Sequence, residues 1–176
     1  MLDATQVALK DGRTAVIRPA KPDDAGPVIE LVNAVGAEGI YIPSDRATRT
    51  TDEMRMEIAK ADTVSALRLV AEVDGRMVAF NGYSRGTWSK NSHTGSLAIY
   101  IHKEFRSISV GQAVMRVGID WARKVGIKKL TLGVFATNER AFNLYRKLGF
   151  AEEGRLKGEV IINGEPVDEL LMTLWL

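Results

Sequence analysis

The sequence predicts an α/β (α+β) fold in which a mixed, mostly antiparallel central sheet carries helices on both faces. Asp74-Gly75 and Asn163-Gly164 each lie between apolar, strand-like segments and are strong signals for two-residue hairpin turns. Between these hairpins, residues 97–149 alternate strand-like and helix-like segments, which is typical of parallel strands joined by a crossover helix. Together these features predict the order β-α-α-β-β-β-α-β-α-β-β in a single domain over residues 1–176.

The first half is predicted to contain four strands and two helices. Pro19 closes a short alternating segment, and Pro22 opens a segment whose apolar residues recur every three and four positions. Thr50 with Glu53 three residues later forms a capping-box pattern at the start of the second helix. The predicted elements are strands over 14–18, 66–73, 77–84 and 94–102, and helices over 22–35 and from Thr50 to about 61.

The second half begins with the strongest helical pattern of the chain, over residues 110–125. Its apolar residues recur at helical spacing, its charged residues face away from them, and Gly126 lies at the C-cap position. Asn138 is a suitable N-cap for a further helix, and Gly149 follows the end of that helix. The remaining predicted elements are a strand over 129–135, a helix over 138–148, and strands over 159–162 and 167–174.

The composition excludes several classes of function. The 176 residues carry a net charge of +2, too small to require nucleic acid or an anionic membrane as a partner. The chain lacks cysteine, so it has no disulfide, thiolate metal site or cysteine nucleophile, and its two histidines argue against a zinc site. The N-terminal segment has no long apolar run, so we expect no signal peptide, no membrane span and a cytoplasmic location.

The segment Arg106-Ser107-Ile108-Ser109-Val110-Gly111 joins an apolar strand to the best-predicted helix. A strand that enters a tight turn and then a helix presents several free backbone N–H groups at one point. Phosphate is the usual anion at such a place, and Tyr145 on the following helix is a possible proton donor. The pattern predicts a nucleotide-bearing cofactor.

This segment, with the downstream pattern of Asn138, Ala141, Leu144-Tyr145 and Leu148-Gly149-Phe150, resembles the GNAT superfamily of acetyl-CoA-dependent N-acetyltransferases. The family turn has Arg or Gln, two variable residues, Gly, one variable residue, and Gly or Ala. Ser109 stands where the family usually has glycine, but serine keeps the backbone N–H and adds a hydroxyl.

The resemblance implies a cofactor site and two catalytic roles. The backbone of Ile99 and Ile101 would bind the pantetheine arm, and the Ile99 N–H would polarise the thioester carbonyl. Tyr145 would protonate the departing thiolate. The implied cofactor-binding residues are Ile99, Tyr100, Ile101, Arg106, Ser107, Ile108, Ser109, Val110, Gly111, Gln112, Asn138 and Tyr145.

The sequence leaves the general base open among His93, Glu38, Glu72 and Tyr41. His93 titrates in the suitable range and lies near the position where relatives carry a base. The phosphinothricin acetyltransferase branch, which the strand over 98–102 resembles, carries a glutamate at or near Ser96, and this chain does not. The glycine-containing segment 36–49 is expected to be a lid or a specificity loop at the acceptor site.

The expected acceptor is the primary amine of a small molecule such as an amino acid or its analogue. The segment Glu153-Gly154-Arg155 and its neighbours also resemble polyamine-like and ribosomal-protein acetyltransferases, so a protein N-terminus is an alternative acceptor. A non-enzymatic acyl-CoA sensor is a further alternative, whereas the low net charge argues against a nucleic-acid module. The resemblance also suggests a homodimer, with residues 174–176 as a possible contact.

Overall fold

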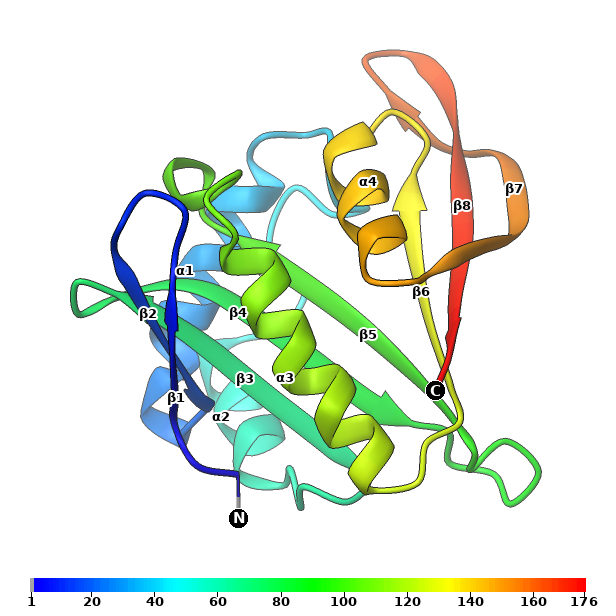
Figure 1. Cartoon of the computed structure of the whole chain (residues 1–176). Helices are drawn as coiled ribbons and strands as arrows, with labels where there is room; N and C mark the ends of the chain where they lie inside the picture. The colour runs from blue at the N-terminus through cyan, green and yellow to red at the C-terminus, as the bar shows by residue number, and fades with distance from the viewer. Residues whose placement is uncertain (1) are drawn as a thin grey trace.

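The computed structural model describes residues 2–176 as one eight-stranded sheet covered by helices on both faces (Figure 1). The strand order is β1-β2-β3-β4-β5-β6-β8-β7, and every neighbouring pair is antiparallel except β5 and β6. The strands are β1 Thr5–Ala8, β2 Thr14–Pro19, β3 Ala66–Val73, β4 Arg76–Arg85, β5 Thr94–Ile101, β6 Lys129–Phe135, β7 Ala151–Ile162 and β8 Glu165–Trp175. The α-helices are α1 Ala25–Gly36, α2 Thr51–Ala59, α3 Val110–Lys124 and α4 Glu139–Lys147, with short 3-10 turns at Pro22–Asp24 and Lys103–Phe105.

The mixed, mostly antiparallel sheet confirms the predicted fold class, with two differences in the strands. Strand β1 was not predicted, because Val7 is its only partly buried side chain and an exposed edge strand lacks an alternating apolar pattern. Strand β7 begins at Ala151 rather than at 159, because its first residues are mostly polar and exposed. Their pairing with β8, rather than their own sequence, makes them a strand.

The predicted turns and caps are confirmed. Asp74 and Asn163 both have φ of 52°, and the glycines that follow them also have positive φ, as two-residue hairpin turns require. The Thr50 hydroxyl accepts from Glu53 N (3.2 Å), and Thr50 N donates to Glu53 Oε2 (2.8 Å).

Two apolar cores lie on opposite faces of the sheet. Helices α1 and α2 cover one face, and α3 crosses the other (Figure 1). On the α3 face the fully buried Tyr83 of β4 packs on Gly118, where an added Cβ would overlap the tyrosine ring. The Trp121 ring lies 5.8 Å from that of Tyr83, so a glycine in α3 makes room for an aromatic pair beneath the helix.

The parallel strands β5 and β6 pair over only a short stretch. They pair at Thr94–Lys129, Gly95–Leu130 and Ser96–Thr131 and then diverge (Figure 1). Strand β5 stays paired with β4 as far as Ile101, and β6 stays paired with β8 as far as Phe135. The divergence opens the sheet at its centre.

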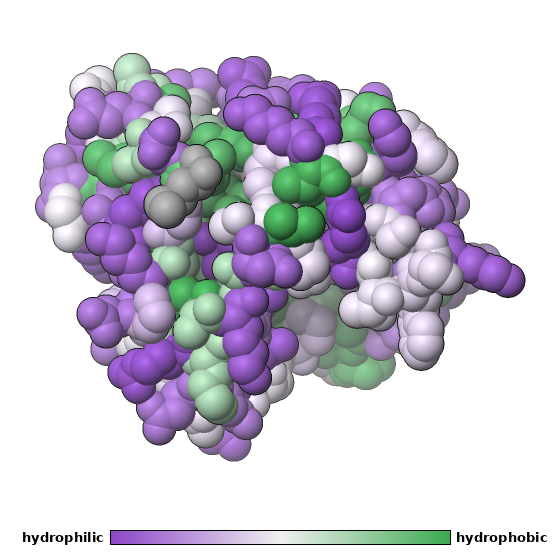
Figure 2. Space-filling model, turned by 90° about the horizontal axis from the view of Figure 1, so that it is seen from below, coloured by the Kyte–Doolittle hydropathy of each residue, from purple (hydrophilic) through white to green (hydrophobic). Residues whose placement is uncertain are grey.

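None of the helices within residues 2–176 is long and apolar enough to cross a membrane. On the face seen from below, apolar residues lie in small groups among hydrophilic ones (Figure 2).

Candidate functional site

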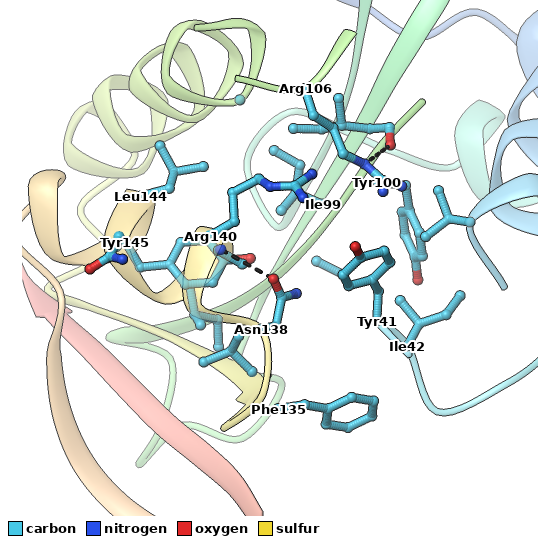
Figure 3. A pocket seen from close by; sticks show the side chains of 18 of the residues that line it. Tyr41, Ile42, Ile99, Tyr100, Arg106, Phe135, Asn138, Arg140, Leu144 and Tyr145 are labelled. Atoms are coloured by element: carbon cyan, nitrogen blue, oxygen red, sulfur yellow. Dashed lines mark hydrogen bonds between the residues drawn. The ribbon is translucent and has the colours of Figure 1, made fainter. Parts of the chain in front are cut away.

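A cavity of about 520 Å³ fills the opening between β5 and β6. In Figure 3, Tyr41 and Ile42 of the segment between α1 and α2 lie across this cavity from Leu144 and Tyr145 of α4. The lining therefore combines the diverging strands, the turn before α3, helix α4 and the segment expected to be a lid.

The backbone of β5 presents unpaired polar groups to this cavity. The bond from His102 N to Val78 O (2.9 Å) continues the ladder between β4 and β5. Since alternate residues of a strand bond in opposite directions, Ile99 and Ile101 point their N–H and C=O groups away from β4, into the opening. Arg106 Nε donates to the Ile101 carbonyl (3.0 Å), so the Ile99 N–H and C=O and the Ile101 N–H stay unpaired within residues 2–176.

The turn before α3 has the free N–H groups that the sequence predicts. None of the backbone N–H groups of residues 107–112 donates to another described residue, and the first helical bond runs from Ala113 N to Ser109 O (3.0 Å). Ser107 and Ser109 have φ of 66° and 80°, which turns successive N–H groups toward one point. This arrangement suits an anion with several oxygens, such as a pyrophosphate.

Gly111 allows this turn to lie close to its neighbours. A Cβ at Gly111 would lie 2.8 Å from Ile101 Cδ1 and 3.0 Å from Leu144 Cδ2. The first turn of α3 is therefore packed between β5 and α4, at the end of the cavity.

Arg106 has close partners within the protein. Its Nη1 donates to Glu38 Oε2 (2.7 Å), its Nη2 pairs with Glu38 Oε1, and its guanidinium lies 4.7 Å from the centre of the Tyr41 ring. Hydrogen bonding to Arg106 lowers the pKa of Glu38. Arg106 thus connects the end of β5 to the segment after α1, in addition to bordering the cavity.

Three further cations line the cavity. Arg140 and Lys147 come from α4, and Lys10 comes from the turn between β1 and β2. Lys10 N donates to Ile108 O (3.2 Å), so the N-terminal hairpin is attached directly to the anion-binding turn. Nothing in the local sequence around Lys10 indicates this contact, because β1 itself was not predicted.

Tyr145 lines the cavity from α4 and is 7% exposed. Its hydroxyl has no hydrogen-bond partner within residues 2–176, and burial raises its pKa above the ordinary value of 10.0. The phenol therefore stays protonated at neutral pH, as a proton donor must. Asn138 also lines the cavity and caps α4, since its Oδ1 accepts from Ala141 N (3.2 Å).

The structure separates His93 from the cavity. His93 is exposed just before β5, six residues from Ile99, or about 20 Å away at the rise of an extended strand. Its carbonyl accepts from Lys128 N (2.7 Å) and Lys129 N (3.2 Å), at the end of the sheet where β5 and β6 are still paired. The expectation that His93 lies near the reacting groups is corrected by this placement.

The other candidate bases differ in their surroundings. The Glu72 carboxylate pairs with Arg18 on the neighbouring strand, and the Glu38 carboxylate is held by Arg106. Of the four candidates, only Tyr41 lines the cavity.

Glu169 is a carboxylate that sequence reasoning missed. It lies on β8 opposite Phe135 and lines the cavity, and its side chain extends over Gly133, where an added Cβ would overlap Oε1. It forms no side-chain hydrogen bond or ion pair within residues 2–176. Ile99 of β5 lines the same cavity, so Glu169 and Ile99 border one opening.

A second cavity, of about 420 Å³, lies on the α1–α2 face of the sheet and adjoins the first along β5. Leu97, Ala98 and Tyr100 line both cavities, as do Ile42 and Pro43 of the segment between α1 and α2. Residues 37–50, between α1 and α2, form this segment, the lid. Because Ala47 N donates to Asn33 Oδ1 (2.7 Å), the lid is attached to α1.

Comparison with known proteins agrees with these features. The model of the acetyltransferase (GNAT) family matches residues 37–150. An L-amino acid N-acetyltransferase of Escherichia coli strain K12 is 29% identical over 162 residues, covering 89% of this chain and 95% of the relative. A putative phosphinothricin acetyltransferase of Bacillus subtilis strain 168 is 28% identical over 157 residues, covering 86% and 93%.

Solved structures of acetyltransferases also resemble this chain. A GNAT-family acetyltransferase from Streptococcus pneumoniae has a TM-score of 0.86 at 28% identity, covering 92% of this chain and 99% of the other. A putative acetyltransferase from Salmonella typhimurium, solved with its cofactor acetyl-CoA, has a TM-score of 0.83 at 22% identity and covers 92% and 93%. The similarity to the Salmonella structure is a similarity of fold.

Proposed function

This chain belongs to the acetyltransferase (GNAT) family, and we propose that it moves an acetyl group from acetyl-CoA to the primary amine of a small molecule such as an amino acid. It is an acetyl-CoA-dependent N-acetyltransferase. The identity of the amine that accepts the acetyl group is what we propose here. The observation that carries the proposal is the meeting of three features at one cavity: the unpaired backbone of β5, the free N–H groups of residues 107–112, and Tyr145.

The residues present fit the cofactor. The free N–H groups of residues 107–112 suit the pyrophosphate, and the unpaired groups of Ile99 and Ile101 suit the amides of the pantetheine arm. Lys10, Arg140 and Lys147 add positive charge around the cavity. When bound, acetyl-CoA supplies the acetyl group as an activated thioester.

Three groups of this chain act in the proposed transfer. The Ile99 N–H donates to the oxygen that gains negative charge as the amine attacks. The Tyr145 hydroxyl delivers its proton to the departing thiolate sulfur. The Glu169 carboxylate accepts the proton that the amine loses, directly or through a water molecule, since it is the carboxylate beside the opening that lacks an ion-pair partner within residues 2–176.

A small acceptor is supported by the lid over the second cavity, where Ile42, Pro43 and residues 46–49 approach the sheet. Curated relatives include a spermidine N(1)-acetyltransferase of Escherichia coli and a putative ribosomal-protein-alanine N-acetyltransferase of Bacillus subtilis. A protein N-terminus and a non-catalytic acyl-CoA sensor are therefore the alternatives to be tested.

A homodimer is also part of the proposal. It is supported by Trp175, a large apolar side chain that is 66% exposed on β8.

The test is a purified-protein assay with acetyl-CoA and a panel of amino acids, polyamines, aminoglycosides and N-terminal peptides, with free thiol as the readout. One acceptor class among the small amines is expected to raise thiol release far above background. Release only with peptides would favour the protein acceptor. Calorimetric binding of acetyl-CoA without release on any amine would favour the sensor.

The role of Glu169 is tested with Glu169→Gln, which keeps the shape of the side chain and removes its basicity. We expect kcat to fall by about 10²-fold at neutral pH and to recover partly at high pH, where more of the amine is already neutral. Glu165→Gln, on an exposed residue of the same strand, is the control. An unchanged pH–rate profile in Glu169→Gln would remove Glu169 from the mechanism.

A further inference from the structure

The second cavity has a strongly positive lining. Arg46 and Arg49 of the lid and Arg68 of β3 line it, and Glu57 of α2 is the single acidic residue of the lining within residues 2–176. Three positive charges and one negative charge give the lining a net charge of +2. A polyamine would be repelled by such a lining, whereas an anionic group would be attracted to it.

Glu57 pairs with two of these arginines, in each case through the arginine Nε atom. Its Oε1 accepts from Arg68 Nε (2.8 Å), and its Oε2 forms an ion pair with Arg49 Nε (2.7 Å). The Nη groups of Arg49 have no hydrogen-bond partner within residues 2–176, and those of Arg68 reach the Leu67 and Tyr83 carbonyls and the Ser84 hydroxyl. Glu57 therefore orients two guanidinium groups and leaves the donors of Arg49 available.

Arg68 is fixed firmly on the floor of the cavity. Its side chain is 11% exposed and lies beside Gly82, where an added Cβ would lie 3.6 Å from Arg68 Cδ. Ser84 and Ser96 face each other across β4 and β5, and both line the cavity with hydroxyl donors. One carboxylate, that of Glu57, balances only one of the two guanidinium charges, and a second carboxylate would balance the other.

The second cavity, with Arg49 and Arg68 in its lining, lies next to the place where the acetyl group is expected. The cavity shares Leu97, Ala98 and Tyr100 with the cofactor cavity, so a molecule bound there lies next to the unpaired backbone of Ile99. An acceptor with a carboxylate near its amine can therefore reach both places. A peptide N-terminus has no carboxylate beside its amine, and spermidine has none at all.

We propose that Arg49 and Arg68, oriented by Glu57, form a subsite for the carboxylate of the acceptor, which is therefore a free amino acid. This inference rests on the proposed function, because it names the acceptor class of the same site. The free Nη groups of Arg49 can bind a carboxylate bidentately, which gives both affinity and orientation, while Arg68, whose Nη groups are already bonded within the protein, contributes its positive charge.

The experiment compares free L-amino acids with the corresponding L-amino acid amides as acceptors. The amide keeps the side chain and the amine but loses the negative charge, and its amine has the lower pKa, so more of it is neutral. We expect the wild-type kcat/KM to be at least about tenfold higher for the best free acid than for its amide. Arg49→Gln, on a residue whose side chain is 55% exposed, should remove most of this preference through KM, with folding intact.

Two further variants sharpen the comparison. Glu57→Gln should weaken the preference less than Arg49→Gln, because both arginines remain but lose their common partner. Arg55→Gln is the matched control, since Arg55 lies on the same helix as Glu57 and pairs at the surface with Asp52. The control should keep the wild-type preference.

A binding readout separates this inference from the proposed function. The Nε–Hε NMR signals of Arg49 and Arg68 are followed while N-acetyl-L-amino acids and their amides are added to the CoA-saturated protein. Shifts in both signals with the acids, and not with the amides, would support the subsite even if no acetyl transfer were detected. Transfer to acids and amides at equal rates, or an absence of shifts, would overturn the subsite, and in the first case the acetyltransferase assignment would stand.

Discussion

Ser109 illustrates at the scale of one residue how a family pattern can change without losing its geometry. Its φ of 80° lies in the left-handed region, and its side chain makes no capping hydrogen bond to α3. A serine in this conformation costs about 1–2 kcal/mol relative to glycine. The sequence comparison correctly expected the N–H to be retained, but it could not reveal that the hydroxyl contributes nothing to the cap.

Ser109→Gly is expected to stabilise the protein. Relief of the left-handed conformation outweighs the extra chain entropy of glycine, for a net gain of about 0.5–1 kcal/mol and a rise in Tm of about 1–4 °C. Thermal unfolding measures the effect, and Ser89→Gly, at a position without positive φ, should give no gain. A collapse in acetyl-CoA affinity would instead make the hydroxyl a required ligand.

Tyr145→Phe tests the proton donor. The substitution removes one hydroxyl that has no partner within residues 2–176, so we expect little change in stability or in acetyl-CoA affinity. Without the proton donor kcat should fall by about 10²-fold or more. Because burial raises the pKa of Tyr145 above 10.0, the wild-type rate should not fall with rising pH until above pH 10. Unchanged turnover in the variant would assign the proton to another source.

At the scale of elements, the packing of α3 on β4 depends on a glycine that periodicity alone would not select. Gly118 belongs to the apolar stripe of α3, and its lack of a side chain admits the Tyr83 ring. The helical pattern predicted where α3 begins and ends because its apolar residues follow one face. It could not predict which residue of β4 meets Gly118, since that contact joins segments 35 positions apart.

Gly118→Ala is expected to destabilise the protein by about 2–3 kcal/mol, because the new methyl group overlaps a fully buried ring. Gly26→Ala is the control, since no atom lies within 4 Å of a Cβ there and alanine favours the helix. Chemical denaturation of both variants gives the two free energies. A loss of stability below 0.5 kcal/mol in Gly118→Ala would mean that the Tyr83 ring can move to another position without cost.

At the scale of the whole molecule, the lid and the sheet are joined through Arg106. Glu38 of the lid accepts from its guanidinium, Tyr41 of the lid lies against it, and the Ile101 carbonyl of β5 accepts from its Nε. The sequence predicted Arg106 as part of the phosphate turn and Glu38 as a candidate base, but not that they are partners. They are 68 positions apart, and only the folded chain brings them together.

The contribution of this contact to lid closure should depend on pH. The pKa of Glu38 is lowered from 4.5 by Arg106, so the stabilisation is complete above about pH 4.5 and is lost as the pH falls through the lower folded-state pKa. Cleavage within the lid by an acid-active protease should therefore rise below pH 4. Glu38→Gln should loosen the lid at neutral pH, whereas Glu30→Gln on the exposed side of α1 should not. Equal cleavage of all three proteins at pH 7 would contradict the role of this pair.

Much of the architecture was accessible from the sequence because hairpin turns, caps and helical periodicity are local signals. The anion-binding turn was accessible for the same reason, since it lies within residues 106–112. Glu169 and Arg68 were not predicted, because a polar residue within a strand becomes part of a site only when the register of neighbouring strands is known.

The opening between β5 and β6 has a consequence for how long the protein survives. Only three residue pairs join the two strands, so the centre of the sheet is weakest in the unliganded protein. A ligand that bonds there adds RT ln(1 + [L]/Kd) to the free energy of unfolding, about 2.7 kcal/mol at a hundredfold excess over Kd. Resistance to unfolding and degradation should therefore follow the supply of acetyl-CoA, so that starvation for the acetyl donor removes the enzyme as well as its substrate.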